Sequence, residues 1–206
     1  TTFVSSSNPN ITLSGTNVLV ASGTPAGNYT LIYRICEVLN PANCDTAIVY
    51  VPVSVAPIEA IADYGTTVNG YTGGTSFTNV LVNDLLNGVA VVPSEVTTTF
   101  VSSSNPNITL SGTNVLVAAG TPAGNYTLIY RICEVLNPTN CDTAIVYVPV
   151  SAPSIVANDD PYGPVNGYTG NPNVGNAFGN DLLDGLPVIP SEITATVLTP
   201  ATPING

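Results

Sequence analysis

Apolar and polar residues alternate along two neighbouring stretches of the chain, residues 124–135 and 141–150. The apolar side of the alternation consists of Tyr126, Leu128, Tyr130 and Ile132 in the first stretch, and of Ala144, Val146, Val148 and Val150 in the second. A period of two predicts half-buried β-strands, and the Asn-Pro between the stretches suits a turn. We therefore expect an antiparallel hairpin whose aliphatic row, Ala144 to Val150, packs inward with Leu128 and Ile132.

The same pattern occurs twice, because residues 1–54 recur as residues 98–151. Only two positions differ between the copies, Ser22 against Ala119 and Ala42 against Thr139. The offset of 97 residues continues beyond this block, since residues 68–74 match residues 165–171. A unit of 97 residues is therefore repeated slightly more than twice, as in tandem-repeat proteins.

Strand signals within one unit are short and regularly spaced. Besides the hairpin, the expected strands are Phe77–Val82, Val89–Val91, Glu95–Ser102, Asn107–Leu110 and Asn114–Ala118. About seven short strands per repeat, separated by turn residues, are typical of an immunoglobulin-like sandwich. A helical period of 3.6 residues is not found. The sequence predicts an all-β chain of tandem immunoglobulin-like β-sandwiches.

Proline-containing stretches at residues 55–60 and 151–157 give the best boundaries, because proline interrupts a strand ladder. They divide the chain into the C-terminal half of one repeat (1–55), a complete repeat (56–152) and the N-terminal half of a following repeat (153–206). We expect such a chain to be a window of a longer array, so that Thr1 is not its biological start. Its two end segments are predicted to continue the array or to complete a neighbouring copy.

The composition supports β-structure and excludes several partners. Charged residues make up 7% of the chain, against about 25% in a typical globular protein. The net charge is −11, with Arg34 and Arg131 as the only cations, so the basic footprint of a nucleic-acid-binding protein is missing. For the same reason an anionic membrane surface is not expected as a partner. No stretch is long and apolar enough for membrane insertion.

Four cysteines occur as two pairs with identical spacing, Cys36 with Cys44 and Cys133 with Cys141. Four functions are common for such pairs: a metal knuckle, a redox pair, a nucleophile and a structural staple. A zinc site needs four ligands, and the chain has no histidine and only one pair per unit. A redox pair would be spaced C-x-x-C, and a catalytic cysteine would require a base such as histidine.

The alternation favours the staple. A register that places Cys133 opposite Cys141 also places Arg131 opposite Thr143, and both cysteines then lie on the outer face of the hairpin. Facing residues in such a pair have Cβ atoms about 4.5–5.5 Å apart, close to what a disulfide needs. We predict disulfides Cys36–Cys44 and Cys133–Cys141, which place the chain outside the cytoplasm.

Three short motifs resemble a known family. They are Ala157-Asn158-Asp159-Asp160, Val80-Leu81-Val82-Asn83-Asp84, and Tyr130 followed by the valine-rich strand at 141–150. With these motifs the chain resembles the bacterial cadherin-like and Ig-like tandem repeats of giant secreted cell-surface adhesins. The resemblance implies a cadherin-like sandwich, secretion to a bacterial cell surface and a role in adhesion.

The resemblance also implies calcium, because acidic residues near domain junctions in such families often bind it. The residues it nominates are Asp159, Asp160 and Asp181. Calcium prefers six to eight oxygen ligands, which carboxylates and carbonyls can supply. The alternative is that these residues form turns and face solvent, and the Asn-Asp pairs at 83–84 and 180–181 are expected to be turn formers.

A further resemblance concerns the sequence CDTA at residues 44–47 and 141–144. It is similar to the Asp-Thr/Ser-small acceptor for O-glycosylation in gliding-type and gut-dwelling bacteria, and implies glycans on Thr46 and Thr143. The alternation places Thr143 on the outer face, which is compatible with a glycan. An ordinary strand threonine is the alternative.

Catalysis is not expected. Without histidine, a Ser-His-Asp or Cys-His site cannot form. Asp159 and Asp160 are adjacent, and adjacent strand residues point to opposite faces, so they would not converge on one substrate. We predict that the chain is not an enzyme and that calcium is the only candidate cofactor.

Two functions remain. The first is a structural stalk or filament repeat of a giant extracellular adhesin, partnered by neighbouring repeats of the same or identical chains in a homo-oligomeric filament. The alternative is a calcium-dependent adhesion module that binds carbohydrate or protein through its loops. Near-identical copying of a unit favours the stalk, because a specific binding site rarely needs such faithful copying.

Overall fold

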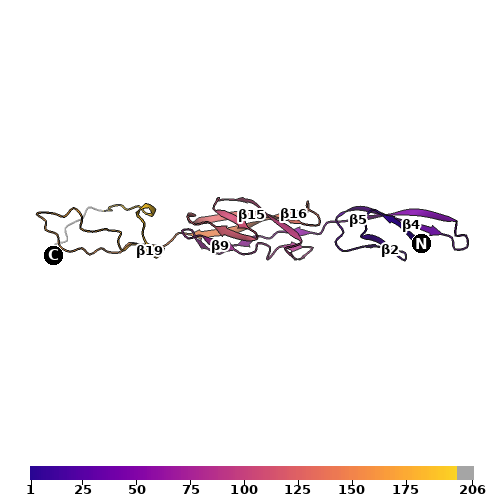
Figure 1. Ribbon diagram of the computed structural model, residues 1–206, viewed down its shortest axis with the longest axis horizontal. Coiled ribbons are helices and arrows are strands. Elements are labelled where there is room, and N and C mark those ends of the chain that lie inside the picture. Colours follow the sequence, from indigo (N-terminus) through magenta and orange to yellow (C-terminus); the bar gives the residue numbers. More distant parts are fainter. Residues whose placement is uncertain (199–206) are drawn as a thin grey trace.

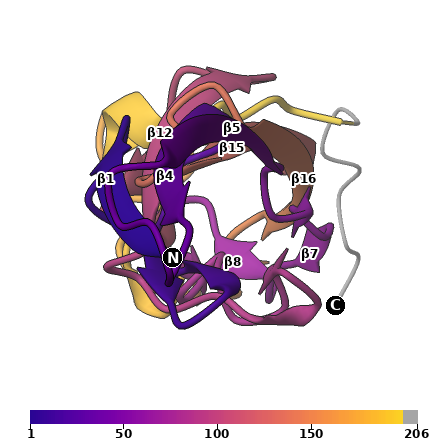
Figure 2. The ribbon, with the colours of Figure 1, turned by 90° about the vertical axis from the view of Figure 1, so that its right-hand side faces the viewer.

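The computed structural model describes residues 1–198, and its regular structure is almost entirely β. Three parts follow one another along a line (Figure 1): the first part (residues 1–53), the middle part (58–151) and the third part (155–198). Viewed down the long axis, the parts lie one behind another (Figure 2). No described helix is long and apolar enough to cross a membrane.

The middle part is a β-sandwich. Its larger sheet has the order β12 (Val96–Ser103), β15 (Gly124–Glu134), β16 (Cys141–Ser151) and β7 (Asp63–Tyr64), and β8 (Val68–Asn69) also pairs with β16. A second sheet consists of β13 (Ile108–Ser111), β14 (Asn114–Val117) and β9 (Gly74–Phe77). A small third sheet consists of β11 (Val89–Ala90), β10 (Leu85–Leu86) and β6 (Ile58–Glu59). The all-β sandwich class predicted from the sequence is confirmed.

The core of the sandwich follows the predicted alternation. Leu128 and Ile132 of β15 and Val146 and Val148 of β16 are buried in one apolar cluster. The β15–β16 register pairs Cys133 with Cys141 and Arg131 with Thr143, as predicted, and it also pairs Ile129 with Ile145. β7 and β8 pair with β16 in parallel, which extends the sheet beyond the hairpin.

The first and third parts repeat pieces of this architecture. In the first part, β1 (Thr2–Ser6), β4 (Gly27–Cys36) and β5 (Cys44–Val53) form one sheet, and β2 (Ile11–Ser14) pairs with β3 (Asn17–Val20). The third part has β17 (Ile155–Val156), β18 (Leu182–Leu183), β19 (Leu186–Pro187) and a single 3-10 turn, η1 (Pro190–Glu192). Shifted by 97 residues, these strands match β12–β16 and β6, β10 and β11, respectively.

One predicted strand needs correction, and several short strands were not predicted. The strand predicted at Phe77–Val82 begins and ends earlier, at Gly74–Phe77, because Asn79 has a φ of 59°, in the left-handed region that stops a strand. Val80 and Leu81 are nevertheless buried in the core. Several two-residue strands, such as β7 and β8, were not predicted, since two residues cannot show a period.

Candidate functional site

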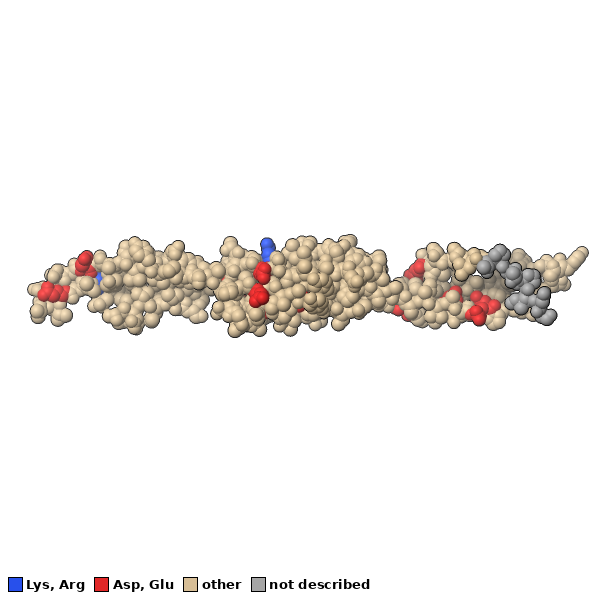
Figure 3. All heavy atoms as spheres, turned by 180° about the vertical axis from the view of Figure 1, so that it is seen from behind, with Lys and Arg blue, Asp and Glu red and all other residues tan. Residues whose placement is uncertain are grey.

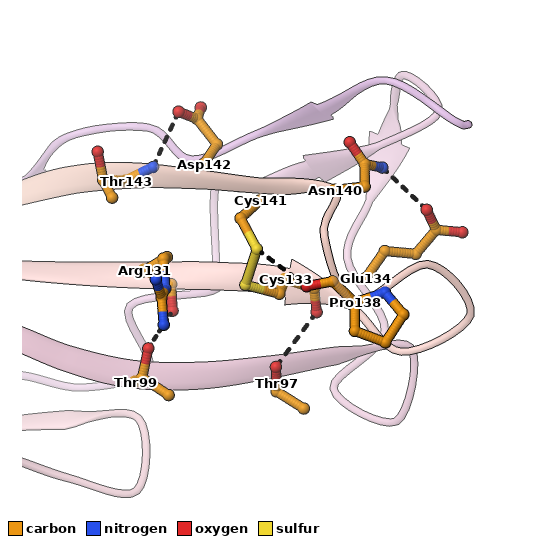
Figure 4. The surroundings of a disulfide bond; sticks show 10 residues. All are labelled: Thr97, Thr99, Arg131, Cys133, Glu134, Pro138, Asn140, Cys141, Asp142 and Thr143. Atoms are coloured by element: carbon orange, nitrogen blue, oxygen red, sulfur yellow. Dashed lines mark hydrogen bonds between the residues drawn. A yellow bond between two sulfur atoms is a disulfide. The ribbon is translucent and has the colours of Figure 1, made fainter. Parts of the chain in front are cut away.

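The disulfides lie at the tips of the two long hairpins. Cys36 is bonded to Cys44 and Cys133 to Cys141, in each case joining residues that are directly opposite in the antiparallel register. Figure 4 shows the second disulfide between β15 and β16, just before the loop that connects them. Cys133 is buried and Cys141 exposed, so one sulfur is more covered than the alternation predicts.

The loop beyond the disulfide is held to its own unit. The Asn140 Nδ2 donates to Glu134 Oε2 at 2.8 Å (Figure 4) and to the carbonyl of Ala56 at 2.7 Å. The backbone N–H of Val135 donates to the carbonyl of Glu95. The disulfide and these hydrogen bonds fix the tip of the hairpin against the start of the unit.

This tip contacts the preceding part of the chain. The Oδ1 of Asn137 accepts a hydrogen bond of 2.7 Å from the backbone N–H of Ala26, 111 residues earlier. Only four residues, 54–57, separate β5 from β6 at this junction, and Pro57 is one of them. The disulfide hairpin of one unit thus supplies a contact to the end of its neighbour.

The second junction, between the middle and third parts, has its own hydrogen bonds. The Nδ2 of Asn69 donates to Asp184 Oδ1 at 2.7 Å, and the Tyr71 hydroxyl donates to Glu192 Oε2 at 3.1 Å. The bond to Glu192 and its negative charge raise the pKa of the exposed Tyr71 hydroxyl. Both partners of the middle part come from the Asn69-Gly70-Tyr71 segment at the end of β8, so this segment is a junction element.

A buried acidic network lies inside the middle part. Asp63 and Asp84 are 2% and 0% exposed. The Asp84 carboxylate accepts hydrogen bonds from the Tyr130 hydroxyl, at 2.9 and 3.1 Å, and from the N–H of Ile61 at 2.7 Å. Neither carboxylate oxygen of Asp63 has a hydrogen-bond partner among the described residues. Asp84 is therefore more than the turn former expected from the sequence, because its carboxylate is buried and accepts hydrogen bonds from Ile61 and Tyr130.

Burial alters the acidity of this network. Desolvation, followed by the neighbouring Asp84 charge, raises the pKa of Asp63 to about 7. Desolvation also raises the pKa of Asp84, and burial with the two carboxylates raises that of Tyr130. A carboxylic acid with a pKa near 7 retains a proton under mildly acidic conditions. Sequence patterns do not reveal this network, since Asp84 and Tyr130 are 46 residues apart.

The residues nominated for calcium lie in the third part. Asp181 Oδ1 accepts a hydrogen bond from the N–H of Asn158, and the Nδ2 of Asn180 donates to the carbonyl of Asp159. Asp159 is exposed, and Asp160 and Asp181 are partly exposed. In the part of the chain that the structure describes, no three His, Cys, Asp or Glu side chains gather closely enough to hold a metal ion. These residues do not form a calcium cluster here, and calcium stays a prediction.

The two threonines nominated for glycans are on strands β5 and β16. Thr46 and Thr143 are both exposed. Each backbone N–H is bonded to the preceding aspartate, at 2.7 Å from Asp45 and at 2.8 Å from Asp142. Figure 4 shows Thr143 beside Asp142 on the edge of the hairpin. Their hydroxyl groups are accessible, and glycosylation stays a prediction.

Comparisons with known proteins give likenesses of fold alone. No protein-family model matches the chain, and no curated protein matches it. The human desmocollin-1 ectodomain has a TM-score of 0.36 and 8% identity, over 65% of this chain and 28% of that one. A protocadherin gammaB7 EC3–6 structure has a TM-score of 0.34 and 15% identity, over 76% and 43%. The chain thus spans less than half the length of these two structures.

Proposed function

We propose that the chain is a stalk segment of a giant extracellular adhesin on a bacterial surface, in which sandwiches placed end to end extend a binding tip. The observation that carries the proposal is the in-line arrangement of the three parts, with side-chain hydrogen bonds at both junctions. Short linkers with Pro57 and Pro153 limit bending between units. The proposal assigns no reaction to the chain.

The proposed units are residues 1–55, 56–152 and 153–206, of which residues 199–206 lie outside the described part. Each unit contacts its sequence neighbours, so the array grows in one dimension. Partners of the chain are therefore further copies of the same unit, in the same chain or in identical chains. Together they would form a thin filament.

A further observation supports an extracellular location. Each hairpin is clamped by a disulfide, and disulfides persist in oxidising compartments.

The surface carries few charges, as the predominance of uncharged atoms in Figure 3 illustrates. The exposed Thr46 and Thr143, on β5 and β16, are the proposed sites of O-linked sugar, which would add solubility to this weakly charged surface.

The alternative function is a calcium-dependent adhesion module that binds carbohydrate or protein. It rests on Asp159, Asp160 and Asp181 in the third part. Addition of a chelator distinguishes the two functions. A stalk without calcium keeps its melting temperature, whereas a module that has bound calcium loses the stability that the ion supplied.

Electron microscopy of the native particle tests the proposal. A sandwich of this size is about 40 Å long, from roughly ten extended residues at about 3.3 Å each plus loops. We expect thin, straight particles with one unit per about 40 Å along the axis. A compact globular particle would contradict a stalk function.

A further inference from the structure

The interior of the middle part contains a group of hydrogen-bond acceptors with too few donors. The Tyr130 hydroxyl has one hydrogen to donate, and four oxygens lie within 3.2 Å of it. The backbone N–H of Ile61 adds one donor, which is used by Asp84. Both oxygens of Asp63 and the Oδ1 of Asn83 have no donor among the described residues. Buried acceptors of this kind destabilise a fold unless an electropositive group lies beside them.

The three unpartnered oxygens belong to neighbouring side chains. Asp63 lies beside Asp84, Tyr130 and Asn83, each of which acts on its carboxyl group, yet none of them is placed to donate a hydrogen bond to it. The Nδ2 of Asn83 is directed at the backbone instead, where it donates to the carbonyl of Ala62 at 3.3 Å. The amide oxygen of Asn83 therefore remains for another partner.

No positive side chain compensates the two carboxyl groups. Asp63 and Asp84 are 2% and 0% exposed. The chain has no lysine or histidine, and its two arginines are Arg34, in the first part, and Arg131. Arg131 is exposed and pairs with the exposed Thr143 on the outside of the sheet. A buried carboxyl group is stable only when it is protonated, paired with a positive group or bound to a metal ion.

A water molecule or a proton would meet only part of this need. Water would donate hydrogen bonds to the unpartnered oxygens, but it would leave the charges of both carboxylates uncompensated. A proton would neutralise one carboxylate and leave the other charged. A divalent cation would compensate both charges and would also bind the oxygens that have no donor.

The available ligands select a hard cation, because all of them are oxygens. They are both carboxylate oxygens of Asp63, the Oδ1 of Asn83, the Oδ2 of Asp84 and the carbonyl of Val80. Zinc and copper favour nitrogen and sulfur ligands. Magnesium usually keeps several water molecules, which suits a buried site poorly. Calcium accepts six to eight oxygens in a flexible geometry and is the best match.

We infer that Asp63, Asn83 and Asp84 bind one calcium ion inside the middle part, with backbone carbonyls among its other ligands. The ion joins β7 to the segment that precedes β10, and Tyr130 of β15 contacts the same carboxylate of Asp84. Three segments that are distant in the sequence are thereby held together. The inference goes beyond the proposed function, because a structural ion would stabilise the sandwich in a stalk and in a binding module alike.

The site lies away from both junctions. Asp63 pairs with Val146, the central residue of β16. Asp160 and Asp181 have the same places in the third part, where both are partly exposed and no counterpart of Tyr130 follows them in the sequence. We therefore expect one ion per 206-residue chain, bound in the middle part.

Calorimetric titration of the full 206-residue chain with calcium chloride tests the inference, after treatment with a chelator and transfer to calcium-free buffer. One ion should bind per chain. In Asp63→Asn, which keeps the shape of the side chain and removes its charge, calcium binding should be at least tenfold weaker. Asp160→Asn is the matched control, since it makes the same change at the same place in the third part, and it should bind calcium like the unaltered chain.

Thermal unfolding shows whether the bound ion stabilises the sandwich. Calcium at about 100 times its Kd should raise the melting temperature of the middle part by at least about 10 °C. This shift should vanish in Asp63→Asn and persist in Asp160→Asn. Cooperative melting of Asp63→Asn in the presence of chelator checks that this variant is folded, so that its loss of binding cannot be attributed to unfolding.

An unaltered chain that binds no calcium would overturn the inference. Binding that is unchanged in Asp63→Asn, or lost in Asp160→Asn, would also overturn it, because the ion would then lie in the third part. None of these results bears on the stalk, which depends on the length of the native particle in electron micrographs. A loss of stability on chelation that disappears in Asp63→Asn belongs to the internal ion and is compatible with a stalk.

Discussion

A hydroxyl group donates one hydrogen bond at a time, yet four acceptors surround that of Tyr130. They are the carbonyls of Ile61 and Val80, at 3.2 and 3.0 Å, and both oxygens of Asp84. Asp63 adds two unpartnered oxygens nearby. With so few donors, a proton on the Asp63–Asp84 pair relieves the excess of negative charge. Burial of the two carboxyl groups is the main reason that their pKa values are raised, and the charge of Asp84 adds to the shift of Asp63.

The first prediction concerns Asp63 and pH. Its pKa of about 7 in the folded state exceeds the ordinary 3.8, so its stabilising effect is complete below about pH 4 and is lost as pH rises through 7. We expect the unfolding free energy of the middle part to fall by about 1–3 kcal/mol from pH 4 to pH 8. In the Asp63→Asn variant, the unfolding free energy should depend less on pH, because only Asp84 still contributes to this dependence. Urea unfolding at several pH values measures it. An unchanged slope would contradict the role of Asp63.

Sequence reasoning could not find this network. Asp84 follows an asparagine and precedes a glycine-containing turn, so its local pattern is that of a surface turn. Its burial depends on Tyr130 and on Asp63, which come from distant strands. Only a three-dimensional pairing of β7 with β16 brings these side chains together, and a two-residue strand has no periodic signal from which to predict it.

At the scale of elements, the long hairpins were the most predictable features. Their alternation extends over ten or more residues in β15 and β16, and the opposed cysteines fix the register. The strands that complete the sandwich are harder to predict from the sequence, because β6, β7, β8 and β10 have two residues each. Their positions are set by tertiary pairing with the hairpin and by burial of side chains such as Val80, not by local pattern.

The second prediction concerns the staple. In the chain-entropy model, closing a loop this short stabilises by about 2–3 kcal/mol. Replacing Cys133 and Cys141 together by serine should lower the unfolding free energy of the middle part by about this amount, measured by urea unfolding. The pair Cys36 and Cys44 is the matched control, because its loss should leave the main transition unchanged. Equal effects of the two double variants would contradict the independence of the parts.

The third prediction compares identical strands in different surroundings. β5 and β16 share their sequence from cysteine to valine, but among residues 1–198 only β16 has a partner on its outer edge. In dilute monomeric protein, we expect amides of β16 to exchange with deuterium at least 100-fold more slowly than those of β5. Peptides that span Ala42 or Thr139 differ in mass, so mass spectrometry can separate the copies. Equal protection would contradict a stabilising role for the pairing of β7 and β8 with β16.

At the scale of the whole molecule, straightness depends on a few contacts between rigid parts. Each junction combines a short linker with one or two hydrogen bonds from loops at the ends of the sandwiches. Small interfaces between domains allow the domains to move relative to one another unless specific hydrogen bonds restrain them. The disulfide hairpin acts here as well, because it holds Asn137 at the position from which it contacts Ala26.

The last prediction tests whether Asn137 restrains the first junction. One hydrogen bond contributes about 0.5–1.5 kcal/mol, so Asn137→Ala should lower the ratio of closed to open junctions by about fivefold. Small-angle X-ray scattering of the dilute monomer should then show a shorter average end-to-end distance. Asn40→Ala is the matched control, since Asn40 occupies the same place in the first part but its side chain donates to Glu37 of its own loop. The Asn137 side chain is the acceptor at the junction and the Asn40 side chain is not, so only Asn137→Ala should bend the molecule. An equal effect of the two variants would show that the loop, and not the contact with Ala26, keeps the molecule straight.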